Sequence, residues 1–368
     1  MRICYFADGE SIHTVRWCRH FASLGHEVHL ISYKKVSIEC VMTHFVDTGN
    51  ISVGGGNWKV LFKFREVKSL LKKIKPDIFH SHYATSYGIT GAFCGFHPYI
   101  ITTLGTDVLI SPQQSYIYKL LLKYAFSKAD WITAMSDHMK AAVVNLGVDP
   151  SKITTIPFGI DPVVFNDSHR KTSTEKFIIT STRNLEPIYN IPHLINSVAI
   201  AKKTIPNIHL NLIYVSASLL DEIKYLVKEK GLENFVTFYG KVSQHKIAEV
   251  LNQSHLFISV SLSDGNNISL NEAMACGAFC IATNIPANTQ WIQDGENGFL
   301  IKINDVTGLT DKIVISYQNY AILQRNAIPM NKKIIQQRAI WNNNMKNVEE
   351  KYQSLLQHKH QRTKLHFK

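Results

Sequence analysis

The sequence lacks the patterns that mark several common classes of protein. Its six cysteines include no C-x-x-C pair and form no Cys/His cluster with zinc-ligand spacing, which argues against a redox motif or a zinc site. No apolar run approaches the about 20 residues that a membrane-spanning helix needs. The N-terminus meets an acidic residue at Asp8, so we expect no signal peptide. These absences predict a cytoplasmic chain with reduced, buried thiols.

Two nucleotide-binding motifs are also missing. The first apolar run, residues 1–7, is followed by "DGESIH", which contains no G-x-G-x-x-G and therefore excludes a dinucleotide-dependent dehydrogenase. The absence of a glycine-rich P-loop argues in the same way against a P-loop kinase. No nucleic-acid recognition module is visible, and we expect no nucleic-acid partner.

What the composition does show is a basic globular protein. The chain has 368 residues, more than one ordinary core holds, and 45% of them are hydrophobic, so we expect two domains. Lysine and arginine number 40 against 28 acidic residues, a formal net charge of +12. That excess favours an anionic partner, such as a phosphorylated substrate or an acidic membrane surface, although it also suits plain solubility.

Short apolar runs alternate with amphipathic segments along the chain, which predicts repeated βα units. The expected strands are 1–7, 27–33, 77–83, 99–105, 129–136, 153–161, 177–183, 209–215, 236–240, 255–261 and 278–284. The polar stretch 166–176 is the best linker. We therefore expect two successive α/β halves, each a doubly wound parallel sheet with helices on both faces. Ligands are then expected at the carboxyl ends of the strands, in a cleft between the domains.

One junction between a loop and a helix stands out in the second half. The stretch "SDGNNISLNEAMACG", residues 263–277, places Asp264 and Glu272 eight residues apart across a loop rich in glycine and asparagine. We expect a helix from Leu270 to Ala275, whose N-terminal amides suit a diphosphate, with Glu272 in its first turn. On spacing alone, an equally good explanation is that both acids merely favour the helix dipole.

The same stretch resembles the E-x7-E signature of the retaining glycosyltransferases of family 4, the glycosyl transferases of group 1. Its usual form is E-G-x-G-x-x-x-x-E-A-M-A-x-G. Five further segments resemble motifs of this family in the same order, and the match covers almost the whole chain. These segments are 11–32, 75–83, 129–140, 154–165 and 294–301.

The resemblance implies an α/β protein with the GT-B fold, in which two Rossmann-like domains face a central cleft. The first domain, 1–167, is expected on the acceptor side, and the second, 168–341, is expected to bind a nucleotide sugar. The last helix, 342–368, is expected to pack back on the first domain.

The resemblance also implies a donor site in the second domain. Glu272 is expected to bind the ribose of a nucleotide diphosphate sugar, Asp264 to contact the sugar hydroxyls as a catalytic-site residue, and Arg183 to clamp the diphosphate. The other donor-binding residues are expected to be Gly265, Asn267, Ile268, Ser269, Leu270, Tyr189, Lys241 and Gly9. Because a guanidinium neutralises the leaving diphosphate, we expect no metal and no other cofactor. The alternative for Arg183 is a surface ion pair.

Two of the donor-site positions depart from the family pattern. Position 264 holds Asp where Glu is usual, so the carboxylate is one methylene shorter. Tyr189 stands where a lysine is usual, which removes one positive charge from the diphosphate. Lys241 is the candidate to replace that charge, and a plain surface lysine is nearly as good an explanation.

A third departure affects the first domain. Leu104 stands where the family has a catalytic-site histidine. His13 and His82 therefore become the candidate catalytic groups of this domain, or else they are core histidines, which is the reading we favour for His80. Asp107, at the same strand end, either faces the site or caps the following segment.

A basic amphipathic helix is expected over 58–75, where seven lysines and arginines alternate with apolar residues. Such a helix suits an anionic lipid surface, and an ordinary helix packed on the sheet explains it equally well. The stretch 116–128 repeats the pattern, which favours peripheral contact with the inner face of the cell membrane.

Together these features predict an enzyme that transfers a sugar from a nucleotide diphosphate sugar, with UDP as the commoner carrier, to a saccharide or a lipid-linked saccharide. Transfer is expected to retain the anomeric configuration by front-face attack. Two alternatives stay open. Asp264, Tyr189 and Leu104 are compatible with a weak or inactive nucleotide-sugar-binding subunit, and a nucleotide-sugar epimerase is the other.

Overall fold

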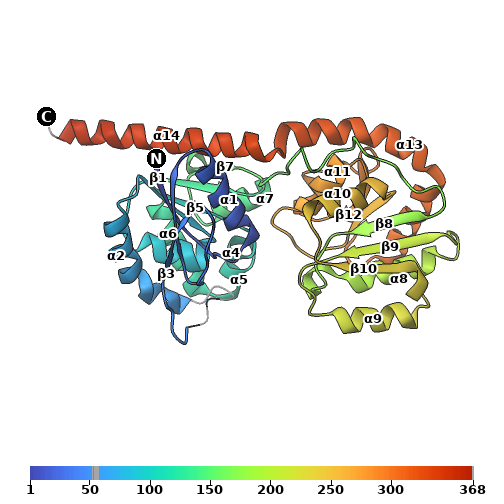
Figure 1. The fold of residues 1–368 in the computed structure, drawn as a ribbon. Coiled ribbons are helices and arrows are strands. Elements are labelled where there is room, and N and C mark those ends of the chain that lie inside the picture. Colours follow the sequence, from blue (N-terminus) through green and yellow to red (C-terminus); the bar gives the residue numbers. More distant parts are fainter. Residues whose placement is uncertain (52, 54–57, 367–368) are drawn as a thin grey trace. The chain divides into compact units, whose positions relative to one another are not determined.

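The computed structural model describes residues 1–51, 53 and 58–366, and the chain forms two compact units (Figure 1). Unit 1 comprises Met1–Ile156 and Met345–Lys368, and unit 2 comprises Pro157–Asn344. The boundary expected after residue 167 thus lies inside unit 2. Each unit has its own parallel sheet.

Unit 1 is built on a seven-stranded parallel sheet with the order β3-β2-β1-β4-β5-β6-β7. Its strands are β1 (Arg2–Phe6), β2 (Glu27–Ser32), β3 (Met42–Phe45), β4 (Ile78–His82), β5 (Tyr99–Thr102), β6 (Trp131–Ala134) and β7 (Ile153–Thr155). The central strands are buried along almost their whole length, which explains their continuous apolar runs. The sequence did not predict β3, because this edge strand is partly exposed and carries no apolar run.

Helices of unit 1 connect these strands. They are α1 (Ile12–Ser23), α2 (Phe64–Ile74), α3 (Ile89–Ala92), α4 (Thr106–Leu109), α5 (Ser111–Gln114), α6 (Tyr116–Lys128) and α7 (Asp137–Asn145), with the short helical turns η2 (Trp58–Lys63), η3 (Ala84–Gly88) and η4 (Pro150–Lys152). Helix α14 (Trp341–His366) begins in unit 2 and continues into unit 1. The single helix expected over 58–75 is in fact a 3-10 turn followed by an α-helix. In α2 the residues Val67, Leu71 and Ile74 are buried, because their spacing of four and three places them on one face.

Unit 2 is built on a six-stranded parallel sheet with the order β10-β9-β8-β11-β12-β13. The strands are β8 (Phe177–Ser181), β9 (Ile208–Ile213), β10 (Val236–Gly240), β11 (Leu256–Ser259), β12 (Phe279–Thr283) and β13 (Gly298–Ile301). The helices are α8 (Ile191–Ala201), α9 (Leu220–Glu229), α10 (Gln244–Gln253), α11 (Ile268–Ala275), α12 (Pro286–Thr289) and α13 (Val306–Arg338), with turns η5 (Pro187–Tyr189) and η6 (Glu233–Phe235). The sequence analysis did not predict β13 as a strand.

Each sheet reverses its strand order at one central pair. In unit 1 the pair is β1 and β4, and in unit 2 it is β8 and β11, where Ile179 pairs with Leu256. The loops that leave the carboxyl ends of such a pair diverge and open a crevice for ligands. The topology therefore selects the loops after β8 and β11 as the place to look for chemistry in unit 2.

Five of the six cysteines are buried, as expected, but Cys40 is exposed, so the expectation is wrong for that residue. Cys276 and Cys280 are packed in the core of unit 2. Within residues 1–51, 53 and 58–366, no helix is long and apolar enough to cross a membrane.

Candidate functional site

Arg183 follows β8 and is held in one orientation by three side chains. Its Nη2 donates to Oδ2 of Asp264 at 2.7 Å, and its Nη1 donates to Oδ1 of Asn267 at 3.1 Å. The guanidinium carbon lies 4.3 Å from the centre of the Tyr189 ring. Arg183 thus forms an ion pair with Asp264, as the alternative expected, but the pair is not on the surface, since the Arg183 side chain is only 9% exposed.

One hydrogen-bond donor of this buried guanidinium is left over. Nε of Arg183 has no hydrogen-bond partner among the described residues. An unsatisfied buried donor costs about 1–3 kcal/mol, and more for a charged group, so native structures rarely keep one without a function. Arg183 therefore keeps one N–H that no described residue uses.

Asn267 connects Arg183 to the start of α11. Its Oδ1 accepts from the backbone N–H of Leu270 at 3.1 Å, which caps the helix. Its Nδ2 donates to Ser259 Oγ at 3.0 Å and to Asn288 Oδ1 at 2.9 Å. Asn267 was expected among the donor-binding residues, but its side-chain cap of α11 was not predicted from the sequence. The preference for Asn at the N-cap position was the signal that could have identified the side chain.

Asp264 and Glu272, the two acids of this loop and helix, differ in their position relative to Arg183 and to α11. Asp264 pairs with Arg183 and is 15% exposed. Glu272 is the fifth residue of α11, because the helix begins at Ile268 and has no acid in its first turn. The expectation that Glu272 lies in the first turn is therefore wrong, and a simple interaction of Glu272 with the helix dipole loses its basis, since that effect fades beyond the first turn.

Most of the remaining predicted donor residues of unit 2 lie close to this group. Gly265 is buried in the loop, Ile268 and Leu270 lie in the first turn of α11, and Ser269 Oγ donates to the carbonyl of Thr182 at 3.4 Å. Lys241 is exposed after β10, which β9 separates from β8, and two strand spacings are about 10 Å. The structure thus gathers most of the predicted set around Arg183 and leaves Lys241 at the sheet edge.

His82 ends β4 and lines a cavity of about 340 Å³ in unit 1, together with Asp8, Lys34, Tyr83 and Leu104 among others. Burial lowers the pKa of His82 to about 3, with a smaller contribution from His13. Neither ring nitrogen of His82 has a hydrogen-bond partner among the described residues. The imidazole is therefore neutral at pH 7, free to donate one hydrogen bond and accept another, and poorly suited to carry a proton near neutral pH.

The other candidates of unit 1 have different surroundings. His80 bonds to Tyr352 Oη at 2.6 Å and Thr102 Oγ1 at 2.7 Å, which confirms that it is a core histidine. Gly9 leaves no room for a side chain, since a Cβ there would lie 2.4 Å from Val36 Cγ2. His13 is the second residue of α1 and is partly buried.

Asp107 is fully buried, and its carboxylate accepts from the backbone N–H groups of Ala84, Leu104 and Gly105. Burial raises the pKa of Asp107, and these hydrogen bonds oppose the rise. The carboxylate therefore ties the loop after β5 to the turn after β4. Asp107 lies inside α4, whose N-cap is Gly105, so it does not cap the following segment as the alternative expected.

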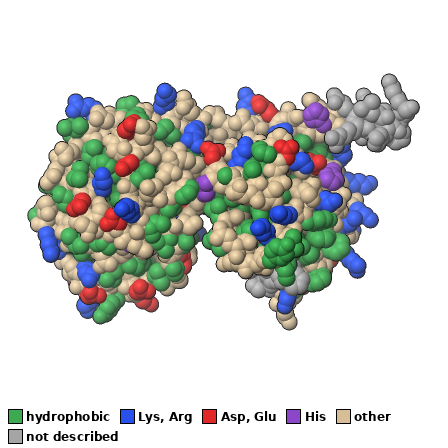
Figure 2. All heavy atoms as spheres, turned by 180° about the vertical axis from the view of Figure 1, so that it is seen from behind, with side chains coloured by type: hydrophobic (Ala, Val, Ile, Leu, Met, Phe, Trp, Pro, Cys, Tyr) green, Lys and Arg blue, Asp and Glu red, His purple; other side chains and the backbone are tan. Residues whose placement is uncertain are grey.

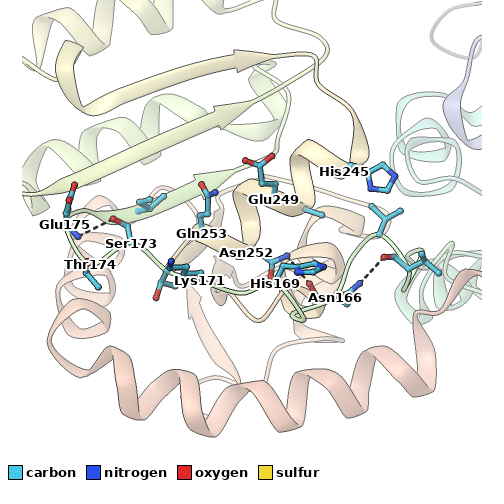
Figure 3. A pocket seen from close by; sticks show the side chains of 15 residues that line it. Asn166, His169, Lys171, Ser173, Thr174, Glu175, His245, Glu249, Asn252 and Gln253 are labelled. Carbon is cyan, nitrogen blue, oxygen red and sulfur yellow. Dashed lines mark hydrogen bonds between the residues drawn. The ribbon is translucent and has the colours of Figure 1, made fainter.

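Unit 2 also contains a hollow, which lies away from Arg183. It measures about 820 Å³ and runs between the polar segment 163–175 and helix α10 (Figure 3). Figure 3 shows Asn166, His169 and Lys171 on the segment and His245 and Glu249 on the helix. Neither Arg183 nor Asp264 lines it, so this hollow is separate from the Arg183 group.

Comparison with known proteins identifies the family. Residues 2–136 match the family model described as glycosyl transferase 4-like, and residues 165–333 match the model described as glycosyl transferases group 1. The chain belongs to the glycosyl transferases of group 1. This glycosyltransferase has relatives along most of its length. It is 27% identical over 317 residues to N-acetyl-alpha-D-glucosaminyl L-malate synthase of Bacillus anthracis, covering 80% of this chain and 81% of the relative.

Another relative is UDP-Gal:alpha-D-GlcNAc-diphosphoundecaprenol alpha-1,3-galactosyltransferase of Escherichia coli. It is 26% identical over 264 residues, or 67% of each chain. Among solved structures, sucrose-phosphate synthase of Thermosynechococcus elongatus has a TM-score of 0.82 at 18% identity, covering 96% of this chain and 99% of that one. Anabaena HepE, solved in complex with UDP, has a TM-score of 0.77 at 16% identity, covering 96% and 100%. The expected GT-B fold is confirmed.

Proposed function

We propose that this glycosyltransferase moves a sugar from a nucleotide diphosphate sugar, with UDP as the carrier, to a saccharide or lipid-linked saccharide and retains the anomeric configuration. The observation that carries the proposal is the buried guanidinium of Arg183, fixed beside the N-terminus of α11 with one N–H unsatisfied. A cation next to the positive end of a helix is the arrangement that binds a diphosphate.

The proposed reaction has one bond made and one broken at the anomeric carbon. The acceptor hydroxyl oxygen attacks that carbon on the face from which the diphosphate departs, and the carbon–oxygen bond to the diphosphate breaks. The acceptor proton passes to the departing phosphate oxygen. Arg183 and the amides at the start of α11 stabilise the negative charge that collects on the diphosphate, so the reaction as proposed requires no metal ion or other cofactor.

Three further assignments belong to the proposal. Glu272 accepts hydrogen bonds from the ribose, and Asp264 orients both Arg183 and the donor sugar. In unit 1, the cavity lined by His82 receives a hydroxyl-bearing part of the acceptor. UDP is favoured because the Escherichia coli relative is named for UDP-Gal and HepE was solved with UDP. That relative is also named for a diphosphoundecaprenol-linked sugar, which supports action on a lipid-linked saccharide.

The first experiment measures ligand binding and turnover separately. UDP- and GDP-sugars are titrated while the thermal unfolding temperature is recorded, and release of the nucleoside diphosphate is then followed without acceptor. We expect stabilisation by a UDP-sugar and slow hydrolysis. Stabilisation without hydrolysis or transfer to any acceptor would favour a binding subunit. A folded protein that no nucleotide sugar stabilises would disprove the proposal.

Variants separate the two roles at the diphosphate and the ribose. Glu272→Ala is expected to weaken donor binding about 10- to 100-fold, because a charged acceptor of two hydrogen bonds is lost. Arg183→Ala is expected to lower kcat about 100- to 1000-fold. Arg325→Ala, which removes an exposed arginine of the same unit, is the control and is expected to change neither. Normal transfer by both site variants would refute the site.

A further inference from the structure

The positive charge of the chain is concentrated in one of its two units. Unit 1 contains 23 lysines and arginines against 13 acids, a net +10, whereas unit 2 contains 17 against 15, a net +2. The diphosphate site lies in unit 2, so binding of the donor does not account for the charge of unit 1. An anionic partner of unit 1 is the direct physical explanation of such an asymmetry.

Within unit 1 the basic residues lie close to exposed apolar side chains. We call the surface formed by residues 59–75, 93–96 and 116–128 the α2–α6 surface. Segments 59–75 and 116–128 contain ten basic residues and one acid, Glu66, which pairs with Lys63 at 2.7 Å. The exposed apolar side chains are Phe62 (66%), Tyr116 (73%), Ile117 (58%), Leu120 (49%) and Tyr124 (37%). Figure 2 shows hydrophobic and basic side chains close together on unit 1.

Aromatic contacts make this one continuous surface. Phe93, just after α3, lies 6.1 Å from Phe64 of α2 and 4.7 Å from Tyr124 of α6, measured between ring centres. A cation covers each outer ring, Arg65 over Phe64 at 5.9 Å and Lys128 over Tyr124 at 5.4 Å. The two basic helices are thus joined by a band of rings with charges at both ends.

A hollow of about 450 Å³ adjoins this band. Its floor is apolar and includes Leu71, Cys94 and Phe96, and the exposed lysines Lys68, Lys72 and Lys75 of α2 and its C-terminal end line it too. Lys359 of α14 adds a fourth cation, 5.5 Å from the ring centre of Phe96. An apolar floor with a cationic rim matches a phospholipid, whose acyl region and phosphate require those two environments.

We propose that the α2–α6 surface docks unit 1 on an anionic phospholipid bilayer. The exposed apolar residues of η2 and α6 enter the interfacial region, and the lysines around the hollow bind lipid phosphates. The biological role of this docking rests on the proposed lipid-linked acceptor. The docking itself requires neither the nucleotide-sugar donor nor the acceptor.

The same surface is less suited to two other partners. A nucleic acid would pair its phosphates with the basic side chains but would place Ile117 and Leu120 against a polar sugar-phosphate backbone. Burying these side chains there would contribute little binding free energy. A second copy of this chain would bring like-charged surfaces together, which is unfavourable. A bilayer accommodates both kinds of side chain in one plane.

The test is co-sedimentation of the full chain with vesicles, in the absence of donor and acceptor. Vesicles of phosphatidylcholine alone are compared with vesicles that also contain phosphatidylglycerol. We expect binding to the anionic vesicles that weakens as salt is added, because the Debye length falls from about 10 Å at 0.1 M to 3 Å at 1 M.

Two variants remove the two components of the surface. Lys68→Gln/Lys72→Gln/Lys75→Gln is expected to weaken binding about 100-fold, at about fivefold for each lysine near an anionic surface. Ile117→Ser/Leu120→Ser is expected to weaken binding even at low salt. The matched controls lie in unit 2 and are Lys224→Gln/Lys228→Gln/Lys230→Gln for charge and Val215→Ser/Tyr225→Ser for exposed apolar area.

Stabilisation by a UDP-sugar in every variant verifies that the donor site of unit 2 is intact, and an unchanged thermal transition of unit 1 verifies the fold of the docking surface. Failure of docking and failure of the proposed reaction are therefore distinguishable. The inference is overturned if the wild type ignores anionic vesicles, or if the unit 2 controls lose as much binding as the unit 1 variants. A nucleic-acid partner would be indicated, and the inference overturned, if duplex DNA competes with vesicles for the lysines of α2 while Ile117→Ser/Leu120→Ser binds vesicles normally. A second copy of the chain would be indicated, and the inference overturned, if Ile117→Ser/Leu120→Ser abolishes a dimer and leaves vesicle binding unchanged.

Discussion

Two arginines of unit 2, Arg170 and Arg183, show how the surroundings of a residue decide its role. Arg170 donates to the carbonyls of Leu251, Ser254 and Cys276 and to a tyrosine hydroxyl. Those partners belong mainly to the backbone, so no ligand can replace them without unfolding the region. Arg183 instead bonds to two side chains and keeps one N–H unsatisfied. We infer that Arg170 is structural and that Arg183 is available to a ligand.

Tyr189 offers a prediction at this scale. Its ring lies under the Arg183 guanidinium, and such a contact contributes about 0.5–2 kcal/mol. Tyr189→Leu is expected to lower kcat/KM for transfer about 2- to 30-fold, since Arg183 loses one of its three supports. Tyr189→Phe retains the ring and is expected to stay within about twofold of the wild type.

The pair of variants distinguishes stacking from the phenol hydroxyl. If Phe and Leu were equally damaging, the hydroxyl would matter and the stacking argument would be wrong. Tyr189→Lys restores the residue type usual in the family at this position. A higher donor affinity in that variant would indicate that charge on the diphosphate limits the wild type.

At the scale of elements, the start of α11 is determined by a network of side chains. The sequence predicted a start at Leu270, whereas the helix begins at Ile268 because Asn267 caps it and is itself held by Ser259 and Asn288. The amides of the first turn are thereby oriented together with Arg183. One asparagine fixes both the helix terminus and the cation beside it.

Asn267→Ala is expected to lower the free energy of unfolding by about 1–3 kcal/mol, because the cap and the partner of a buried guanidinium are both lost. It is also expected to weaken UDP-sugar binding. Asp305→Ala removes the N-cap of α13, whose side chain accepts from Gly308 at 2.8 Å, and serves as the control. We expect the control to lose stability alone, as measured by urea unfolding and donor titration. Equal effects on binding would contradict the shared role of Asn267.

Strand β4 ends in a histidine whose titration predicts a pH dependence. The pKa of His82 is about 3 in the folded chain, below the usual value of about 6.5. The unfolded chain therefore takes up this proton first as the pH falls. Between about pH 6.5 and pH 3 the contribution to stability declines, by up to about 1.4 kcal/mol per pH unit.

His82→Phe keeps an aromatic ring beside Trp17 and Tyr5 and removes the titrating group. Urea unfolding at pH 7 and pH 5 is the measurement. We expect the wild type to lose about 2 kcal/mol more than the variant over this interval. His80, whose pKa burial also lowers, remains in both proteins and leaves a residual slope. Parallel pH profiles for the two proteins would contradict the predicted burial of a neutral His82.

At the scale of the whole molecule, the two units have separate cores, and we propose separate tasks for them. Each contains its own parallel sheet with its own reversal of strand order. Most of the predicted donor residues lie in unit 2, and most of the net charge lies in unit 1. A ligand of one unit is therefore expected to stabilise that unit first.

Calorimetry with UDP tests this division. At 100 times its dissociation constant, UDP is expected to contribute about 2.7 kcal/mol and to raise the unfolding temperature of unit 2 by about 5–10 °C. Ile179→Ala in unit 2 and Ile101→Ala in unit 1 each remove a fully buried side chain, so they identify which transition belongs to which unit. A shift confined to the transition of unit 1 would contradict a donor site built around Arg183.

The sequence by itself determined the alternation of strands and helices, the two α/β halves and the acids that mark the donor loop. Buried parallel strands require continuous apolar runs, and such runs can be recognised directly in the amino-acid sequence. The edge strands β3 and β13 were not predicted; in β3 the partly exposed residues carry no such run.

Only the tertiary structure decided which side chains meet. Arg183 and Asp264 are 81 residues apart, and they pair because β8 and β11 lie side by side at the point where the sheet reverses its order. The stacking of Tyr189 and the joining of α2 to α6 through Phe93 likewise depend on packing between segments distant in the chain. Local patterns specify elements because their causes act over a few residues, whereas a site is assembled from loops whose proximity depends on strand order.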